Sequence, residues 1–352
     1  MTYEYDYLVI GSGIAGLIYA LQVSKYGKVA VVTKSSLNDC NTDHAQGGIA
    51  AAIDPKDSFA AHIEDTYQAG AELGKRQVIA EIISSAPQLI QYLIDLGTDF
   101  TLRDPAYDIC LENLSLTMEG GHTRRRIAYA ADSTGHQIME ALIAQCRKNP
   151  NIDIFEYHIA IDLITQHHVV QDEGFVPGIS CWGAYVLETK ENKVDIFKAR
   201  KTMLATGGAA QIYSPNTNPK VTTGDGMAMA RLAGGRLANM EFVQFHPTAF
   251  WNPDGETFLI SESLRGEGAV LRLSDGSTFM ENYHPQGNLA PRDIVSRAID
   301  SELKKRGEKF CYLDATRVPS EQLLKHFPSI NSMLKAQGID FTVDPIPVAP
   351  AA

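Results

Sequence analysis

The fold is decided by the stretch Tyr5-Asp-Tyr-Leu-Val-Ile-Gly-Ser-Gly-Ile-Ala-Gly16, which is followed by an apolar segment to Tyr26 and then by Val29-Ala-Val-Val32. A short apolar run ends at Ile10, three glycines follow in the spacing Gly-x-Gly-x-x-Gly, and residues 17–26 carry apolar side chains at helical spacing. The pattern predicts a strand, a glycine turn, a helix and a second strand.

Each glycine has a separate purpose in such a turn. Gly11 permits the sharp turn out of the strand, Gly13 lets a pyrophosphate approach the backbone, and Gly16 lets the helix pack closely on the sheet. The free N–H groups and the dipole at the helix N-terminus favour an anion there. We therefore expect a dinucleotide site, with an ordinary strand-to-helix turn as the alternative.

The end of the second predicted strand departs from the dinucleotide fingerprint. It reads Thr33-Lys34, where an acid usually binds the ribose hydroxyls. Lys34 by itself favours an additional phosphate and therefore NADP, so these residues leave the cofactor class open.

Composition narrows the class of protein. A chain of 352 residues has room for two domains, and a net charge of -11 argues against nucleic acid and anionic membranes as partners. The five cysteines are odd in number and no pair has metal-ligand or redox spacing, so we expect buried thiols in a reduced compartment and no metal site. The acidic N-terminus does not resemble a signal peptide, and no apolar run could span a bilayer, which predicts a cytoplasmic protein.

Further motifs follow along the chain. Ala45-Gln-Gly-Gly-Ile-Ala50 is either a capped turn or a backbone that lies against a flat ring. Glu119-Gly-Gly-His-Thr-Arg-Arg-Arg126 is either a charged surface turn or a site for a substrate with an amine and carboxylates. A second glycine turn, Thr206-Gly-Gly208, follows a short apolar strand, and Gly224-Asp-Gly226 opens a helix.

The sequence also predicts the intervening elements. Residues 76–97 have helical periodicity that Pro87 is expected to divide into two helices, and residues 152–164 alternate as one strand. Residues 183–189 and 193–197 are expected to form a hairpin. From about residue 241 polar segments punctuated by proline predict a second domain.

Taken together, these blocks resemble the flavoprotein family of succinate dehydrogenase, fumarate reductase and L-aspartate oxidase. The similar blocks occur in the family's order: Gly11-Ser-Gly-Ile-Ala-Gly16, Ala45 to Ala50, Ala205 to Gly208, Gly224 to Gly226, Gln244-Phe-His-Pro-Thr248, Leu264-Arg-Gly-Glu-Gly268 and Pro291-Arg-Asp293. The resemblance implies an α/β fold, with a Rossmann-like FAD-binding domain and an inserted α+β capping domain.

The resemblance also implies the cofactor and the residues that bind it. In this family the cofactor is FAD, and Asn41 stands where the respiratory enzymes carry a flavin-linking histidine, which implies non-covalent binding. The family commonly lacks the acid after the second strand, so Lys34 no longer argues for NADP. The implied cofactor-binding residues are Gly11, Ser12, Gly13, Ala15, Gly16, Thr33, Lys34, Asn41, Thr42, Gln46, Gly47, Gly48, Thr206, Gly207, Gly208 and Asp225.

Glu119 selects a branch within the family. The block Glu119-Gly-Gly-His122 is similar to that of the L-aspartate-oxidising members, whereas the dicarboxylate enzymes have an uncharged residue there. A carboxylate suits the ammonium group of aspartate. By resemblance, the catalytic residues are Arg292, Glu119 and His246, and the substrate-binding residues are Ser261, Glu262 and Arg265.

The resemblance therefore implies FAD-dependent oxidation of L-aspartate to iminoaspartate, with oxygen or fumarate as acceptor, in NAD biosynthesis with quinolinate synthase as a candidate partner. Residues 1–239 are expected to form the front of the FAD-binding domain and residues 240–352 the capping domain. The family's later substrate residues, the rest of its FAD-binding domain and its helical C-terminal domain have no counterpart in this sequence. The rival hypotheses are a fumarate reductase or succinate-oxidising flavoprotein, and a non-catalytic FAD-binding fragment.

Overall fold

The computed structural model describes residues 1–166, 178–253 and 257–352, and the chain divides into two compact units. The first unit comprises residues 1–44, 138–213 and 218–243, and the second comprises residues 45–137, 214–217 and 244–352. Each chemical motif predicted from the sequence lies within one of these units.

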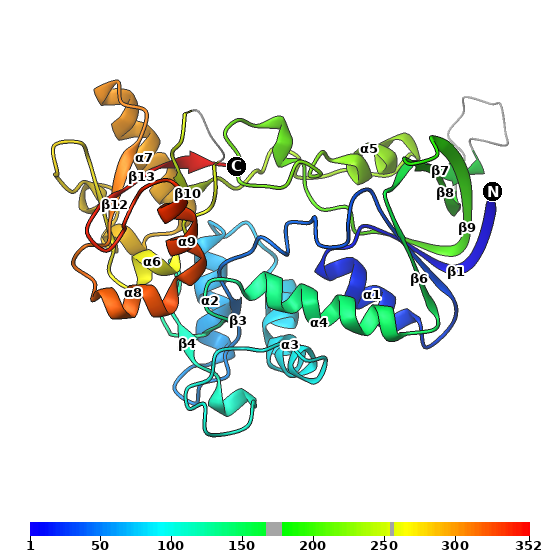
Figure 1. The fold of residues 1–352 in the computed structure, drawn as a ribbon, viewed down its shortest axis with the longest axis horizontal. Helices are drawn as coiled ribbons and strands as arrows, with labels where there is room; N and C mark the ends of the chain where they lie inside the picture. The colour runs from blue at the N-terminus through cyan, green and yellow to red at the C-terminus, as the bar shows by residue number, and fades with distance from the viewer. Residues whose placement is uncertain (167–177, 254–256) are drawn as a thin grey trace. The chain divides into compact units, whose positions relative to one another are not determined.

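The first unit is built on a six-stranded sheet in the order β6-β2-β1-β9-β8-β7. Strands β6, β2, β1 and β9 are parallel, whereas β9, β8 and β7 form an antiparallel meander. The central strand β1, blue in Figure 1, lies against the green β9 over most of its length. The strands are β1 (Thr2–Ile10), β2 (Val29–Thr33), β6 (Ile152–Glu156), β7 (His158–Thr165), β8 (Cys181–Glu188) and β9 (Lys193–Leu204).

Apolar residues from this sheet and from helix α5 make one buried core of the first unit, which includes Leu8, Val32, Val186 and Phe197. The helices are α1 (Ile14–Val23), the part of α4 (Thr134–Lys148) from Ile138 onward, α5 (Asp225–Leu232) and the short η3 (Ala210–Ile212). Helix α1 begins directly after the glycine turn that ends β1, as the sequence predicts.

The second unit combines two small sheets with helices. One sheet has the order β3-β5-β4 and the other the order β10-β13-β12-β11. Its strands are β3 (Ile49–Ala50), β4 (Leu116–Thr117), β5 (Ile127–Ala128), β10 (His246–Phe250), β11 (Val270–Arg272), β12 (Cys311–Asp314) and β13 (Ile346–Ala351). Its helices are α2 (Phe59–Ala69), α3 (Arg76–Asp95), η1 (Leu111–Asn113), α6 (Ser263–Gly266), η4 (Met280–Asn282), η5 (Gly287–Leu289), α7 (Arg292–Arg306), α8 (Ser320–His326) and α9 (Pro328–Ala336).

The α/β class is confirmed, but three predicted elements differ. Helix α3 continues through Pro87, because residues on both sides of the proline, Ile83 and Ile90, bury one continuous apolar face. The predicted strand 152–164 is two strands, since Tyr157 has a φ of 60° that ends β6 before β7 begins. The hairpin of β8 and β9 is confirmed, and β9 also includes the apolar segment that we expected to be a separate strand.

The compact units divide the chain differently from the expected boundary near residue 240. Residues 45–137 group with residues 244–352, so the second unit is assembled from two distant parts of the sequence. The roles of the segments 1–239 and 240–352 as FAD-binding and capping domains remain a prediction. Within the three described ranges, no helix is both long and apolar enough to cross a membrane.

Candidate functional site

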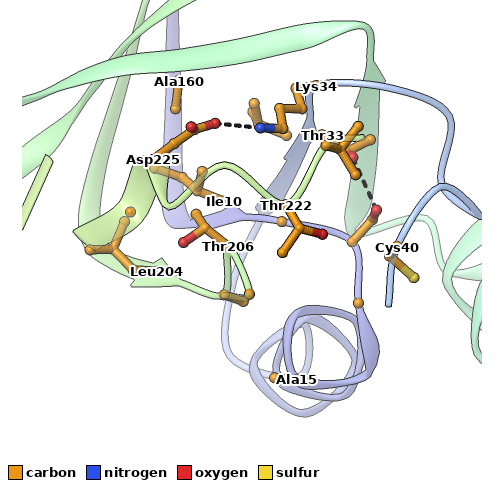
Figure 2. A pocket seen from close by; sticks show the side chains of 18 of the residues that line it. Ile10, Ala15, Thr33, Lys34, Cys40, Ala160, Leu204, Thr206, Thr222 and Asp225 are labelled. Atoms are coloured by element: carbon orange, nitrogen blue, oxygen red, sulfur yellow. Dashed lines mark hydrogen bonds and ion pairs between the residues drawn. The ribbon is translucent and has the colours of Figure 1, made fainter. Parts of the chain in front are cut away.

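A pocket of about 520 Å³ lies in the first unit, around the end of β1 and the start of α1. Its size is within the range of small-molecule sites. The predicted residues that line it are Gly11, Ser12, Gly13, Ala15, Thr33, Lys34, Asn41, Thr42, Thr206, Gly207 and Asp225. Figure 2 shows Ala15 on the first turn of α1, with Thr33 and Lys34 at the end of β2.

The three glycines of the turn meet different surroundings. Gly11 has a φ of 111°, and a Cβ there would lie 2.2 Å from the carbonyl oxygen of Ala205. A Cβ on Gly16 would lie 2.1 Å from the carbonyl oxygen of Gly11. At Gly13 the nearest atom would be Thr42 Oγ1 at 3.5 Å, so the protein's own packing leaves room for a side chain at this position. A ligand that approaches the backbone at Gly13 accounts for a glycine at this position, and the pocket therefore fits a diphosphate.

Lys34 is paired with an acid from another part of the chain. Its Nζ lies 2.6 Å from Asp225 Oδ2, at the start of α5 (Figure 2). The same Nζ lies 2.6 Å from Thr223 Oγ1. Burial opposes the ionisation of Asp225, but hydrogen bonds from Lys34 and Thr223 outweigh it and lower the pKa of the carboxyl group. The charge of Lys34 is thus balanced by a carboxylate from α5.

Hydrogen bonds fix the loops of the pocket. Ser12 Oγ lies 3.0 Å from Thr33 Oγ1, which ties the glycine turn to β2, and Thr42 Oγ1 accepts from the backbone N–H of Ile14. Asn41 accepts from the Thr222 hydroxyl at 2.7 Å. Five predicted cofactor residues do not line the pocket: Gly16 and Gly208 in the first unit, and Gln46, Gly47 and Gly48 in the second unit. Gly16 serves the packing of the turn, and Gly208 accepts from the N–H of Gly224.

Sequence reasoning missed several lining residues. They include Asp39, Cys40, His158, Ala160, Thr222 and Met229. Asp39 and Cys40 directly precede the predicted Asn41, and Met229 lies on the helix that Gly224-Asp-Gly226 opens. His158 and Ala160 belong to β7, which has no motif and is brought to this pocket by the strand order of the sheet.

In the second unit, four charged side chains form what we call the carboxylate–guanidinium cluster, made of Glu119, Glu262, Arg265 and Arg292. Arg292 Nε donates to Glu262, and Arg292 Nη2 lies 3.7 Å from Glu119 Oε2. Arg265 Nη2 lies 3.1 Å from Glu262 Oε1. Motifs separated by up to 173 positions (292 − 119) in the sequence therefore converge, as the resemblance predicts.

Two neighbours that the sequence did not single out form hydrogen bonds with this cluster. Ser263 Oγ donates to Glu119 Oε1 at 3.1 Å, and Arg292 Nη1 donates to Gln244 Oε1 at 3.1 Å. Ser263 directly follows the predicted Glu262, and Gln244 begins the block that contains His246, so their proximity in sequence was the available signal.

The cluster shifts the titration of Glu119. Burial raises the pKa of its carboxyl group, the negative charge of Glu262 adds to this, and Arg292 opposes it. Burial acts to lower the pKa of the Arg292 guanidinium. The negative charge of Glu262 and its hydrogen bond outweigh the effect of burial, so the pKa is raised. Arg292 is therefore a permanent cation, which suits a carboxylate anchor.

His246 lies buried at the start of β10. Burial lowers the pKa of the imidazole well below its usual value, and the charges of Arg292 and Arg265 act in the same direction. Its Nδ1 accepts from the backbone N–H of Thr248 at 3.2 Å, which leaves the proton of the neutral ring on Nε2. His246 is thus a neutral hydrogen-bond donor. Ser261 is also buried, and its Oγ accepts from the N–H of Ser263.

The predicted ring-binding segment lies in the second unit. A Cβ on Gly47 would lie 2.8 Å from Glu119 Oε1, and one on Gly48 would lie 2.2 Å from the carbonyl oxygen of Ala128. The side chain of Gln46 is buried, and its Oε1 has no hydrogen-bond partner among the described residues. An unpaired buried acceptor is costly, so a ligand that donates to Gln46 fits this position.

The glycine-lined pocket and the charged cluster can be compared with known proteins. The family model described as "FAD binding domain" matches residues 6–352. L-aspartate oxidases of Pseudomonas aeruginosa and Vibrio cholerae are 45% and 46% identical to this chain over 99% of its length. The chain spans 64% of the length of each of these two relatives.

Solved structures give the same fold. A quinol fumarate reductase of E. coli superposes with a TM-score of 0.88 at 31% identity, over 100% of this chain and 60% of that one. Sdh1 of Mycobacterium smegmatis superposes with a TM-score of 0.75 at 32% identity, over 99% of this chain and 59% of that one.

Proposed function

Because the chain belongs to the FAD binding domain family, we propose that it is the FAD-binding and substrate-binding part of an L-aspartate oxidase. The observation that carries the proposal is Glu119, an acid beside Gly47 and within 3.7 Å of Arg292. The identity of about 45% with L-aspartate oxidases supports it.

FAD binding is proposed to be non-covalent and to use the predicted residues. Gly13 and the N-terminus of α1 would take the diphosphate, and Asp225 would accept from the ribose hydroxyls. The balanced charge of Lys34 supports FAD over a ligand with an additional phosphate. Asn41 is hydrogen-bonded through its side chain to Asn218 and Thr222, which supports a structural part for it rather than a covalent one.

The substrate would be held by charge complementarity. A bound flavin would supply the acceptor for the two electrons that leave the α-carbon of aspartate. Arg292 would anchor a carboxylate, and the Nε2–H of His246 and the hydroxyl of Ser261 would donate to carboxylate oxygens. Glu119 would accept from the ammonium group, while Glu262 keeps Arg265 and Arg292 in place.

The substrate ammonium must lose a proton during the oxidation, and residues of this chain are placed to accept it. Glu119 has a raised pKa and a hydroxyl donor at 3.1 Å, so it is suited to accept hydrogen bonds from an ammonium and to share its proton. Arg292 is the second candidate for proton transfer, but its raised pKa makes carboxylate anchoring the better-supported role.

Oxygen or fumarate is proposed as the final acceptor, and the fold shared with a quinol fumarate reductase supports fumarate. The imine product reacts with water, so an enzyme that consumes it must act promptly. We propose quinolinate synthase, in NAD biosynthesis, as that partner. A cytoplasmic location stays a prediction, and relatives in tobacco and Arabidopsis are named chloroplastic.

The test is an absorbance titration of the full-length protein with FAD under nitrogen. We expect L-aspartate to bleach the oxidised flavin, because the site holds both an ammonium acceptor and carboxylate anchors. Bleaching by succinate and not by L-aspartate would instead establish the rival dicarboxylate enzyme, and flavin absorbance that no substrate changes would establish a non-catalytic protein.

The substitution Glu119→Gln distinguishes an L-aspartate oxidase from an enzyme that acts on fumarate or succinate. It removes the charge and keeps the shape, so we expect aspartate binding to weaken by about 2–5 kcal/mol, the cost of breaking a buried ion pair. Binding of fumarate or succinate should be retained, since neither has an ammonium. A variant in which both ligands weaken equally would contradict the role given to Glu119.

A further inference from the structure

The loop that carries Glu119 is held from one side by a buried arginine. This β4–β5 loop, residues 118–126, connects two strands of the sheet β3-β5-β4 and ends at Arg126. Arg126 is 0% exposed, and with Arg265 it has the largest volume among the fully buried side chains in the described part of the chain. A buried guanidinium requires partners for its charge and donors.

Two aspartates satisfy this guanidinium. Arg126 Nε lies 2.7 Å from Asp57 Oδ2 and Nη2 lies 2.9 Å from Asp57 Oδ1, which is a bidentate pair. Arg126 Nη1 lies 2.6 Å from Asp65 Oδ2. Asp65 belongs to α2, and Asp57 precedes Ser58, whose hydroxyl caps that helix. The side chain of Arg126 thus ties the end of the loop to α2 at two points.

Further contacts reach the middle of the loop. Asp65 Oδ2 also accepts from the backbone N–H of Thr123 at 2.9 Å and from its hydroxyl at 2.8 Å. His122 Nδ1 lies 3.2 Å from Arg126 Nη1. On the other side, the N–H of Gly120 donates to Glu262. The loop is therefore fixed between α2 and the carboxylate–guanidinium cluster, with Glu119 next to the second anchor.

We propose that Arg126 is a positioning residue: with Asp57 and Asp65 it fixes the β4–β5 loop and thereby sets the place of Glu119. The inference rests on the proposed function for the role of Glu119. Arg126 reaches Glu119 only through the loop, so it acts on specificity and not on the reacting atoms. Loss of the bidentate pair between Arg126 and Asp57 should let Glu119 move away from Arg292, while Arg265 and Arg292 stay in place.

The test uses the full-length protein with FAD and the substitution Arg126→Lys, which keeps the charge and loses the bidentate geometry. We expect the KM for L-aspartate to rise about tenfold to 100-fold, the usual cost of misplacing a substrate contact. The dissociation constant of succinate should change less than about threefold, because its carboxylates do not use Glu119. In a Glu119→Gln background the same substitution should change the KM for L-aspartate less than about twofold.

Equal losses in both backgrounds would overturn the inference, since they would show that Arg126 acts independently of Glu119. Arg272→Lys is the matched control, because Arg272 makes a 2.7 Å pair with Asp314 elsewhere in the second unit. If Arg126→Lys fails to fold, Thr123→Ala removes one hydroxyl contact of the same clamp and should raise the KM in the same direction.

Hydrogen exchange gives a readout that does not depend on turnover. Amides of residues 119–125 should exchange faster in Arg126→Lys than in wild type or Arg272→Lys, and unchanged exchange would overturn the inference. A wild-type protein that leaves L-aspartate unoxidised would refute the proposed function, and the exchange comparison would still decide whether Arg126 holds the loop.

Discussion

At the scale of single residues, the carboxylate–guanidinium cluster places two acids beside two guanidinium groups, of which Arg265 is buried and Arg292 is half-buried. Glu119 has a raised pKa because burial and the charge of Glu262 disfavour its ionised form. A site of this kind costs stability when no ligand is bound, and the ammonium of a substrate would offset that cost.

This cost predicts the effect of Glu119→Gln on stability. The folded pKa of Glu119 lies above the unfolded one, so the stability that this group contributes is present below the unfolded pKa and is lost as pH rises through the folded pKa. Glutamine does not titrate. The variant should therefore gain Tm relative to wild type as the pH is raised from about 5 to about 8, measured without substrate by differential scanning fluorimetry.

Glu302→Gln is the control for this prediction, because hydrogen bonds from Lys305 and Tyr283 lower the pKa of Glu302. Its contribution is present above the unfolded pKa and is lost only as pH falls below that value, so the Tm difference between this variant and wild type should change little between about pH 5 and about pH 8. The same trend in both variants would contradict the assignment of a raised pKa to Glu119.

The sequence could predict which residues form the cluster, because Glu119, Glu262 and Arg292 each stand in a motif. It could not predict the ion pair of Lys34 with Asp225 in the glycine-lined pocket, which joins residues 191 positions apart. Such a pair follows from the sheet order and has no local signal. For this reason Thr33-Lys34 alone left open the choice between FAD and NADP, which the family resemblance then decided in favour of FAD.

At the scale of elements, the glycine turn between β1 and α1 shows which local predictions succeed. Its backbone demands are local, so the strand, turn and helix follow from adjacent residues. Pro87 failed as a helix boundary because the buried face of α3 is a tertiary property that outweighs one lost hydrogen bond.

The turn gives a paired prediction. Gly16→Ala would place a methyl group 2.1 Å from the carbonyl oxygen of Gly11, so we expect a loss of about 1–3 kcal/mol in the free energy of unfolding in urea. Gly13→Ala meets only Thr42 Oγ1 at 3.5 Å, and it should keep the fold but weaken FAD binding. Equal stability of the two variants, or FAD binding unaffected by Gly13→Ala, would contradict these separate purposes.

At the scale of the whole molecule, the expected boundary near residue 240 could not reveal that residues 45–137 group with residues 244–352. Composition changes near residue 241, but contacts between distant segments have no compositional signal. The glycine-lined pocket likewise collects residues from 10 to 237 of the first unit.

A ligand held by so many segments should stabilise the molecule. We expect FAD to raise the Tm of the full-length apoprotein, and the rise should grow with the logarithm of the FAD concentration. FMN should raise it less, because the proposed site around Gly13 and Asp225 binds the adenosine half that FMN lacks. An equal effect of the two flavins would contradict this placement of the nucleotide.

The position of β1 between β2 and β9 has a consequence for biosynthesis. Translation makes Thr2–Ile10 long before its partner strand Lys193–Leu204, which follows residues 45–137 of the second unit. Until then one edge of the oldest strand presents unpaired amides to the cell. We therefore expect nascent-chain chaperones to be needed most during the interval after β1 has been synthesised and before β9 has been synthesised.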